Sequence, residues 1–121
     1  MKEEDKKTAA LVETIIKAIE DRKGHNIVSL DLRKIENASC KYFIICHGTS
    51  NTQVESIAKH IIDEAQDVLG EKPMSKEGFE NAYWILLDYF DVVVHVFYEE
   101  AREFYSIEDL WADAEVNVIN E

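Results

Sequence analysis

One run of residues decides how the chain folds: Trp84-Ile85-Leu86-Leu87-Asp88-Tyr89-Phe90-Asp91-Val92-Val93-Val94-His95-Val96-Phe97. Hydrophobic residues fill both of its arms and two acids stand near its middle, a pattern typical of two strands joined by a tight turn. A two-residue loop at Tyr89-Phe90 would fold the run into an antiparallel hairpin. The expected pairs are then Asp88 with Asp91, Leu86 with Val93, and Trp84 with His95.

Alternation of side chains gives this hairpin two chemically different faces. One face is almost purely apolar, and we expect it to lie in the core: Tyr83, Ile85, Leu87, Val92, Val94, Val96 and Tyr98. The other, called the mixed face below, combines large apolar groups with two acids: Trp84, Leu86, Asp88, Asp91, Val93, His95 and Phe97. The composition of the mixed face is typical of a surface that binds a basic partner.

The overall composition describes an acidic globular protein. The chain has 121 residues, 46% of them hydrophobic, and a net charge of −12. This is the length of one domain, and we expect a single domain over residues 1–121 with a structured core of about 8–114 and frayed ends. The charge disfavours free nucleic acid as a partner and favours a basic protein, although the acids concentrated in residues 98–121 are equally typical of a solvated tail.

Several classes of protein are disfavoured by simple absences. No apolar run is long enough to span a membrane, and the charged residues 1–7 lack the apolar segment of a secretory signal. Cys40 and Cys46 are too few for a disulfide framework and have no metal-ligand partners at useful spacing. We therefore expect a cytoplasmic protein with reduced thiols and no membrane contact.

Helices and strands follow one another along the chain. We expect a helix at 8–21, strands at 27–32 and 42–46, and a long helix that begins near the caps Ser50 and Thr52 and ends at Gly70. There is then room for one short strand within 73–78 before the hairpin. Helical turns follow at 99–105 and after Ser106, and we expect a frayed end from Glu115. This order predicts an α/β (α+β) fold: a mixed four- or five-stranded sheet with two long helices on one face and the mixed face left partly open.

The residues argue against three kinds of catalytic site. Gly48-Thr49-Ser50 precedes a helix but lacks the lysine and second glycine of a phosphate loop, so a helix cap is the better interpretation. Nucleotidyltransferases place a similar turn here, but they need a pair of acids on a later strand, whereas Asp88 and Asp91 flank a turn. The histidines do not fall at metal-ligand spacing, and no serine or cysteine is supported as a nucleophile. We expect no catalytic residue, no metal site and no cofactor.

The mixed face remains as the candidate site, and two interpretations of it stay open. In the first it binds a protein partner, with Trp84 as an aromatic anchor surrounded by charge. In the second Tyr105, Leu110 and Trp111 fold back and bury it within the monomer. One surface can serve both purposes.

An ordered series of motifs also carries a family resemblance. The motifs are Tyr42-Phe43-Ile44-Ile45-Cys46, Gly48-Thr49-Ser50, Glu77-Gly78, Trp84-Ile85-Leu86-Leu87-Asp88, Asp91-Val92-Val93-Val94-His95-Val96-Phe97, Arg102, Tyr105, Glu108, Leu110-Trp111 and Asp113-Ala114. Together, over about residues 8–114, they resemble the ribosomal silencing factor (RsfS, Iojap) family. The resemblance implies a nucleotidyltransferase-like fold without catalytic acids, and therefore a protein that is not an enzyme. Members bind the large ribosomal subunit through its basic ribosomal protein number fourteen, block joining of the small subunit at the intersubunit face, and repress translation.

The family motif implies nine partner-binding residues: Trp84, Leu86, Asp88, Asp91, Val93, His95, Arg102, Tyr105 and Trp111. On the mixed face we expect apolar contacts from Trp84, Leu86 and Val93 and charge contacts from Asp88 and Asp91. In an alternative interpretation, Tyr105 and Trp111 support the hairpin and do not contact the partner. Phe90 stands where glycine is usual in the family. Since tight turns often need a positive φ, this residue favours a different or longer turn.

Two further functions and one assembly state stay open. A factor for large-subunit assembly and, less favoured, a divergent nucleotidyltransferase are the alternative functions. The open mixed face also predicts a homodimer that forms off the ribosome.

Overall fold

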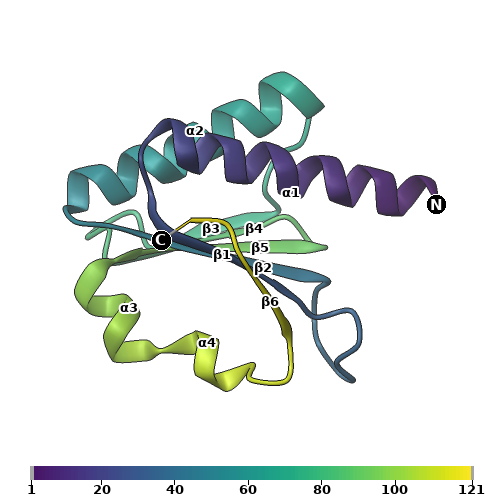
Figure 1. Ribbon diagram of the computed structural model, residues 1–121. Coiled ribbons are helices and arrows are strands. Elements are labelled where there is room, and N and C mark those ends of the chain that lie inside the picture. Colours follow the sequence, from purple (N-terminus) through teal and green to yellow (C-terminus); the bar gives the residue numbers. More distant parts are fainter. Residues whose placement is uncertain (1, 121) are drawn as a thin grey trace.

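A six-stranded mixed sheet forms the middle layer of the protein, with two long helices on one face and two short helices on the other (Figure 1). The computed structural model describes residues 2–120. The helices are α1 (Glu3–Asp21), α2 (Asn51–Leu69), α3 (Glu99–Tyr105) and α4 (Ile107–Leu110). The strands are β1 (His25–Asp31), β2 (Tyr42–Gly48), β3 (Ser75–Glu77), β4 (Trp84–Asp88), β5 (Val92–Tyr98) and β6 (Glu115–Val118). The predicted α/β class is confirmed, and the sheet has more strands than the four or five expected.

Local chemistry favours both ends of α2 and the start of α1. Helix α2 follows Ser50, whose Oγ accepts a hydrogen bond of 3.0 Å from the backbone N–H of Gln53. It ends at Gly70, whose φ of 66° is left-handed and therefore suits glycine. Helix α1 begins at Glu3, before the expected Thr8, and acidic side chains in its first turn suit the positive end of the helix dipole.

The main hydrophobic core lies between the sheet and the two long helices. Strands β2 and β5 pair in parallel, in register from Tyr42 with Val92 to Gly48 with Tyr98. Isoleucines at helical spacing in α1 and α2 pack on this pair and on β4: Ile15, Ile19, Ile57 and Ile61 are all fully buried. Burial of each such side chain contributes roughly 1.5–3 kcal/mol, so this layer dominates the stability.

The hairpin exists, but its predicted register is wrong. Strand β4 pairs with β5 as Trp84 with Phe97, Leu86 with His95, and Asp88 with Val93. The loop lies one residue later than expected, because the Tyr89 side chain is buried in the main core and extends the pairing with Val92. Moving the loop by one residue shifts every partner by two, so the strand residues keep their predicted faces, and only Asp91, now in the turn, leaves the mixed face.

The turn of the hairpin centres on Phe90, which has a φ of 76°. The backbone N–H of Asp91 donates to the carbonyl of Tyr89 at 3.0 Å, which makes a three-residue γ-turn. Asp88 Oδ1 accepts from the backbone N–H of Phe90 at 2.8 Å and steadies it. Phenylalanine therefore occupies a left-handed conformation that glycine would adopt without strain.

The C-terminal part is ordered against the sheet, and the expectation of a frayed end from Glu115 is corrected. Strand β6 pairs antiparallel with β1, and Asn120 Oδ1 accepts a 2.9 Å hydrogen bond from the backbone N–H of Ile27. On the way to β6 the chain passes beneath the sheet as α3 and α4 (Figure 1). These short helices cover a second hydrophobic cluster: Val28, Leu30, Leu32, Ile45, Phe97, Ala101 and Ile107. The second face of the sheet is thus more covered than expected.

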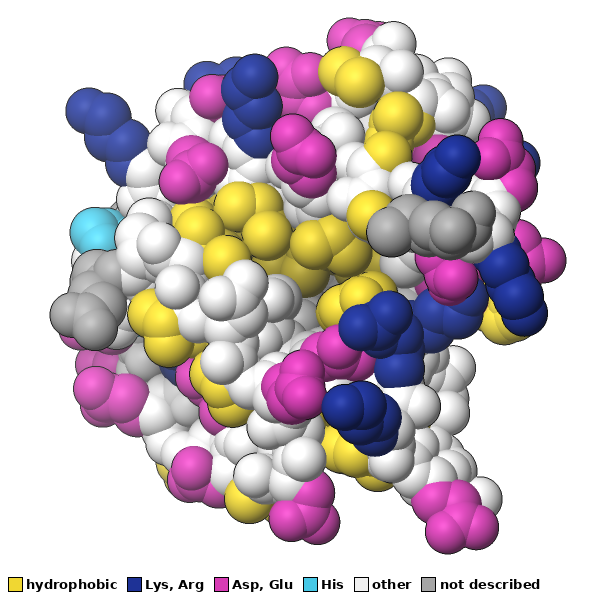
Figure 2. All heavy atoms as spheres, turned by 45° about the vertical axis from the view of Figure 1, so that its right-hand side comes forward, with side chains coloured by type: hydrophobic (Ala, Val, Ile, Leu, Met, Phe, Trp, Pro, Cys, Tyr) yellow, Lys and Arg dark blue, Asp and Glu magenta, His cyan; other side chains and the backbone are white. Residues whose placement is uncertain are grey.

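Helix α1 does not close completely over the β1–β6 side of the sheet. A groove of about 520 Å³ lies between α1 residues such as Val12 and Ile16 and the strand residues Ser29, Tyr42 and Asn117. Figure 2 shows hydrophobic side chains gathered in a hollow on this side of the molecule, with charged side chains around them. Within residues 2–120, no helix is both long and apolar enough to cross a membrane.

Candidate protein-interaction surface

The mixed face is built around a hydrogen-bonded aromatic pair. Trp84 Nε1 donates to His95 Nδ1 at 3.1 Å, although the two residues are diagonal neighbours and not the direct pair that the sequence predicted. Phe43 lies edge-on to the His95 ring with centroids 4.6 Å apart, and Phe97 stacks on Trp84 at 4.9 Å. Alternation along β2, β4 and β5 places all four rings on the same side of the sheet.

His95 is a neutral, buried member of this pair. Only 5% of the residue is exposed, and burial lowers the pKa of His95 to about 4. Because Nδ1 accepts from Trp84, the ring proton is on Nε2, which is buried and has no hydrogen-bond partner among residues 2–120. His95 therefore orients Trp84 and does not offer a charge to a partner.

The part of the mixed face nearest β3 stays accessible. Trp84, Leu86, Asp88 and Val93 are all partly exposed, and they lie on neighbouring positions of β4 and β5. The structure thus brings together the three residues expected to supply apolar contact. Asp88 adds a carboxylate at the hairpin end of the same surface, where its Oδ1 also supports the turn.

Tyr105 and Trp111 fold back on the mixed face, as the second interpretation predicted, but they cover only part of it. The Tyr105 ring lies 4.8 Å from that of Trp84, and the Trp111 ring lies edge-on to Phe43 at 5.5 Å. Leu110 does not take part, since 76% of it is exposed. The aromatic surface therefore continues from the sheet onto α3 and α4.

Exposed hydrophobic residues on the short helices extend this surface. Phe104 is 79% exposed and Tyr105 44%, and their rings contact each other at 5.1 Å. Sequence reasoning missed Phe104 and assigned Leu110 only to the buried interpretation. The available signal was the pair Phe104 and Tyr105 in a short segment that is otherwise rich in acids. We call Trp84, Leu86, Val93, Phe104 and Tyr105 the aromatic patch, and we group with it the exposed Leu110 of the following helix α4.

Acidic side chains are frequent in the segment that carries Phe104, Tyr105 and Leu110. Helices α3 and α4 and the residues that follow carry Glu99, Glu100, Glu103, Glu108, Asp109 and Asp113, with Arg102 as the sole basic residue from 98 to 121. Arg102 is already engaged, because its guanidinium makes a two-pronged contact with the Glu108 carboxylate at 3.0 and 3.1 Å. The patch therefore presents a surplus of negative charge.

Arg102 is a structural brace and not an exposed contact residue. Its side chain is 11% exposed, and it also donates to the Asn26 carbonyl at 2.8 Å and contacts His47 Nδ1 at 2.9 Å. Burial, and then the neighbouring guanidinium, lower the pKa of His47. These contacts join α3 and α4 to the start of β1 and the end of β2.

Asp91 does not lie with the other mixed-face residues, and its predicted placement is corrected. Its Oδ2 accepts from Thr8 Oγ1 of helix α1 at 3.2 Å and lies 3.8 Å from Lys41 Nζ. In the observed register it is a turn residue, so strand alternation no longer directs its side chain. It therefore points towards the long-helix side and tethers α1.

The candidate nucleophiles and acid pairs do not form a catalytic arrangement among residues 2–120. Burial raises the pKa of the Cys46 thiol to about 12 and that of Cys40 to about 11, so neither forms a reactive thiolate at neutral pH. Asp88 and Asp91 bind different partners and belong to no group of three potential metal ligands within the described residues. Among residues 2–120, this surface therefore has no pair of acids arranged as metal-assisted phosphoryl transfer needs.

Comparison with known proteins identifies related sequences over nearly the whole chain. The model of the family described as "Ribosomal silencing factor during starvation" matches residues 5–121. The chain is 44% identical over 97 residues to the ribosomal silencing factor RsfS of Bacillus subtilis, covering 80% of each protein. It is 30% identical over 115 residues to the chloroplastic protein Iojap of Zea mays, covering 93% of this chain and 48% of the maize protein.

Solved structures show the same fold at similar identity. A crystal structure of a Chromobacterium violaceum protein superposes with a TM-score of 0.81 at 35% identity, covering 86% of this chain and 85% of the other. A Bacillus halodurans protein superposes with a TM-score of 0.76 at 38% identity, covering 85% and 94%. On the family match and these relatives, the chain belongs to the ribosomal silencing factor family.

Proposed function

We propose that this protein binds the large ribosomal subunit and represses translation by physically preventing the small subunit from joining. The observation that carries the proposal is the aromatic patch, half-open in the monomer and surrounded by acids. Exposed aromatic residues beside a partly exposed tryptophan are typical of the centre of a protein interface. Membership of the silencing factor family supports the ribosome as the partner of this patch.

The proposed partner is the basic ribosomal protein number fourteen at the intersubunit face. Acids around the patch, such as Asp88, Glu103 and Asp109, would face lysine and arginine side chains of that protein. Charge complementarity of this kind raises the association rate and fixes orientation, whereas the aromatic contacts slow dissociation. The net charge of −12 opposes contact with ribosomal RNA, so the approach is through protein.

Repression in this proposal needs occupancy alone. The protein would act without catalysis and without a cofactor, in the cytoplasm where ribosomal subunits join. Asp88 accepts from the backbone N–H of Phe90, whereas Asp91 accepts from Thr8, and these different partners support a binding role over a divergent nucleotidyltransferase.

Two measurements test the proposal together. Purified protein should co-sediment with isolated large subunits and not with small subunits, and at saturation it should suppress the light-scattering increase that accompanies subunit joining. Normal joining at saturating occupancy would refute the blocking mechanism, even if binding were observed. Precursor particles that accumulate on loss of the protein, with joining unaffected, would instead indicate the large-subunit assembly role.

We also propose that the aromatic patch supports a homodimer when the protein is off the ribosome. Phe104 and Leu110 are among the most exposed hydrophobic residues described, and a second copy would remove them from water. Sedimentation equilibrium should show a dimer that dissociates on addition of large subunits. A monomer mass that does not depend on concentration would contradict this.

A further inference from the structure

Helices α1 and α2 bring three potential metal ligands together on the side of the sheet opposite the aromatic patch. His60 and Glu64 lie one turn apart on α2, and Asp21 is the last residue of α1. His60 Nε2 is 3.0 Å from Asp21 Oδ2 and 3.6 Å from Glu64 Oε1. All three ligand atoms lie within 4.8 Å of one another.

The two separations from the imidazole are close to those of a small divalent ion. Zinc binds imidazole nitrogen and carboxylate oxygen at about 2.0–2.2 Å, which in a tetrahedral site puts ligand atoms roughly 3.3–3.6 Å apart. The imidazole-to-carboxylate distances of 3.0 and 3.6 Å bracket that range. An ion would therefore need only small rotations of the two carboxylates.

The ligand atoms are held by rigid parts of the fold. The His60 side chain is 16% exposed, and the helix faces below it meet through the fully buried Ile19, Ile57 and Ile61. Gln53 Nε2 fixes the end of α1 on α2 by donating to the backbone carbonyls of Arg22 and Lys23 at 3.2 and 3.1 Å. Positions preset in this way reduce the ordering cost of binding an ion.

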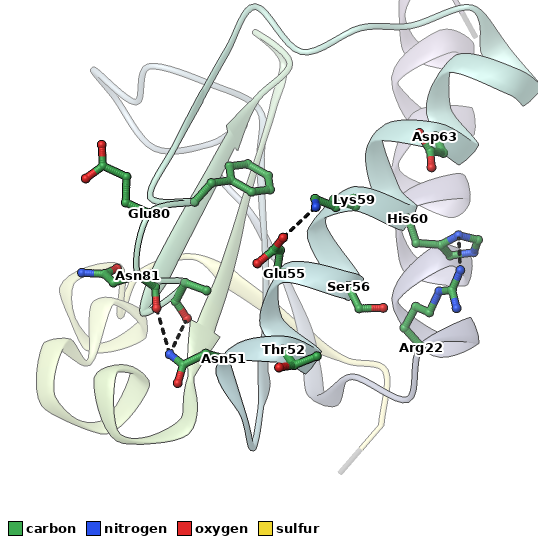
Figure 3. A pocket seen from close by; sticks show the side chains of 12 residues that line it. Arg22, Asn51, Thr52, Glu55, Ser56, Lys59, His60, Asp63, Glu80 and Asn81 are labelled. Carbon is green, nitrogen blue, oxygen red and sulfur yellow. Dashed lines mark hydrogen bonds and ion pairs between the residues drawn. The ribbon is translucent and has the colours of Figure 1, made fainter.

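Arg22 contacts the imidazole of His60 and opposes metal binding in the observed arrangement. Its Nη2 lies 3.4 Å from His60 Nδ1, and Figure 3 shows the guanidinium next to the imidazole. When Arg22 donates to Nδ1, the ring proton is on Nε2 and points at Asp21. An ion bound at Nε2 would require the proton on Nδ1, where an acceptor and not a guanidinium is favoured. Arg22 is exposed, so its side chain is free to turn into solvent.

We propose that Asp21, His60 and Glu64 bind one divalent transition-metal ion, with zinc the best match to one imidazole and two carboxylates. Three protein ligands leave a fourth position for water. The ion would join the C-terminal end of α1 to the middle of α2 and stabilise their packing. The signal in the sequence was the pair His60 and Glu64 at i and i+4, a spacing that puts both side chains on one face of a helix but contains only one histidine.

Titration calorimetry with zinc chloride and the full-length protein tests the proposal. We expect one saturable site, at least about tenfold weaker in His60→Gln and in Glu64→Gln. Asp63→Asn is the matched control, because it removes the same charge from the adjacent, exposed position of α2 and should bind zinc as the unaltered protein does. Equal affinity in Glu64→Gln and Asp63→Asn, with both folded by circular dichroism, would overturn the proposal.

Two further measurements separate a built site from loose attraction of cations to an acidic protein. Cobalt in place of zinc should give the visible absorption bands of a tetrahedral ion, and these should be absent in His60→Gln. Arg22→Gln should bind zinc several-fold more tightly, since it removes a positive charge and supplies an oxygen that can accept from Nδ1. Cobalt spectra without tetrahedral bands, or weaker zinc binding by Arg22→Gln, would contradict the proposed coordination.

Discussion

Burial of His95, which accepts a hydrogen bond from Trp84, makes the stability of the protein depend on pH. Trp84 donates to Nδ1, and His95 is enclosed by Phe43 and Phe97, so protonation of the ring would bury an uncompensated charge. The low pKa of His95, about 4, follows from this burial. Protonation of His95 at low pH would therefore disturb the position of Trp84 in the aromatic patch.

We expect His95 to reduce stability as the pH falls from about 6.5 to about 4. The pKa of His95 is about 4 in the folded protein, below the ordinary value of 6.5, so the unfolded chain binds the proton first and is favoured by acid. The full effect is about 3 kcal/mol at pH 4 and is absent above neutrality. Urea unfolding across this range should show the loss, and His95→Gln should show a smaller slope. Parallel pH profiles for the two proteins would contradict the assignment.

Phe90 imposes a second cost at the scale of one residue. Its φ of 76° lies in the left-handed region, which costs a residue with a side chain roughly 1–2 kcal/mol. Since 62% of Phe90 is exposed, replacing it loses little packing. Phe90→Gly should therefore stabilise the protein by about 0.5–1 kcal/mol after the larger chain entropy of glycine is subtracted. Thermal unfolding measures this, with Phe90→Ala as the control that keeps the strain, and equal stability of the two variants would show that the turn is relaxed.

At the scale of elements, Arg102 holds the short helices against the sheet. It links Glu108 of α4 to His47 of β2 and to the carbonyl of Asn26 in β1. These are charge-assisted bonds in a half-enclosed setting, where removal of one partner leaves the others unsatisfied. The position of the aromatic residues on α3 depends on this single side chain.

Arg102→Ala should destabilise the protein by about 3 kcal/mol, because the Glu108 carboxylate and the carbonyl of Asn26 lose their donor. Arg102→Lys should recover only part of this, since an ammonium group cannot make the two-pronged contact. Chemical denaturation gives both values. Full recovery in the lysine variant would show that charge alone, and not the shape of the guanidinium, holds α3 in place.

At the scale of the whole molecule, the sheet separates the two surfaces for which we propose functions. The aromatic patch lies on the α3–α4 side, and the Asp21, His60 and Glu64 cluster lies on the α1–α2 side (Figure 1). Because the sheet lies between them, variants of one surface should leave the other unchanged. Loss of zinc binding and loss of ribosome binding are therefore separate outcomes.

Exposed residues of the patch provide the cleanest test of ribosome binding. We expect Phe104→Ala combined with Leu110→Ala to weaken large-subunit binding roughly tenfold or more while the fold is unchanged, since neither side chain is buried. Val68→Ala is the control: it is 60% exposed on α2, across the sheet. Unchanged affinity in the double variant would place the ribosome contact elsewhere.

Charge reversal at the hairpin should distinguish its two acids. Asp88→Lys should slow association with large subunits, because Asp88 is on the accessible side of the mixed face. Asp91→Lys should chiefly reduce stability, because it places a cation beside Lys41 and removes one of the two acceptors of the Thr8 hydroxyl. Stopped-flow association at two salt concentrations, with a parallel unfolding measurement, separates these effects. Equal losses of association rate would contradict the observed placement of Asp91.

Local patterns in the chain were enough to assign the two hairpin faces, the long helices with their caps at Ser50 and Gly70, the mixed sheet and the family. These features depend on neighbours a few positions apart, so they are written in the spacing of residues. Packing between distant segments decided the rest. Burial of Tyr89 moved the turn to Phe90, and the new turn places Asp91 beside Thr8 and away from the mixed face. The end of α1 met His60 of α2 for the same reason, since those residues are 39 positions apart and only the folded helices bring them together.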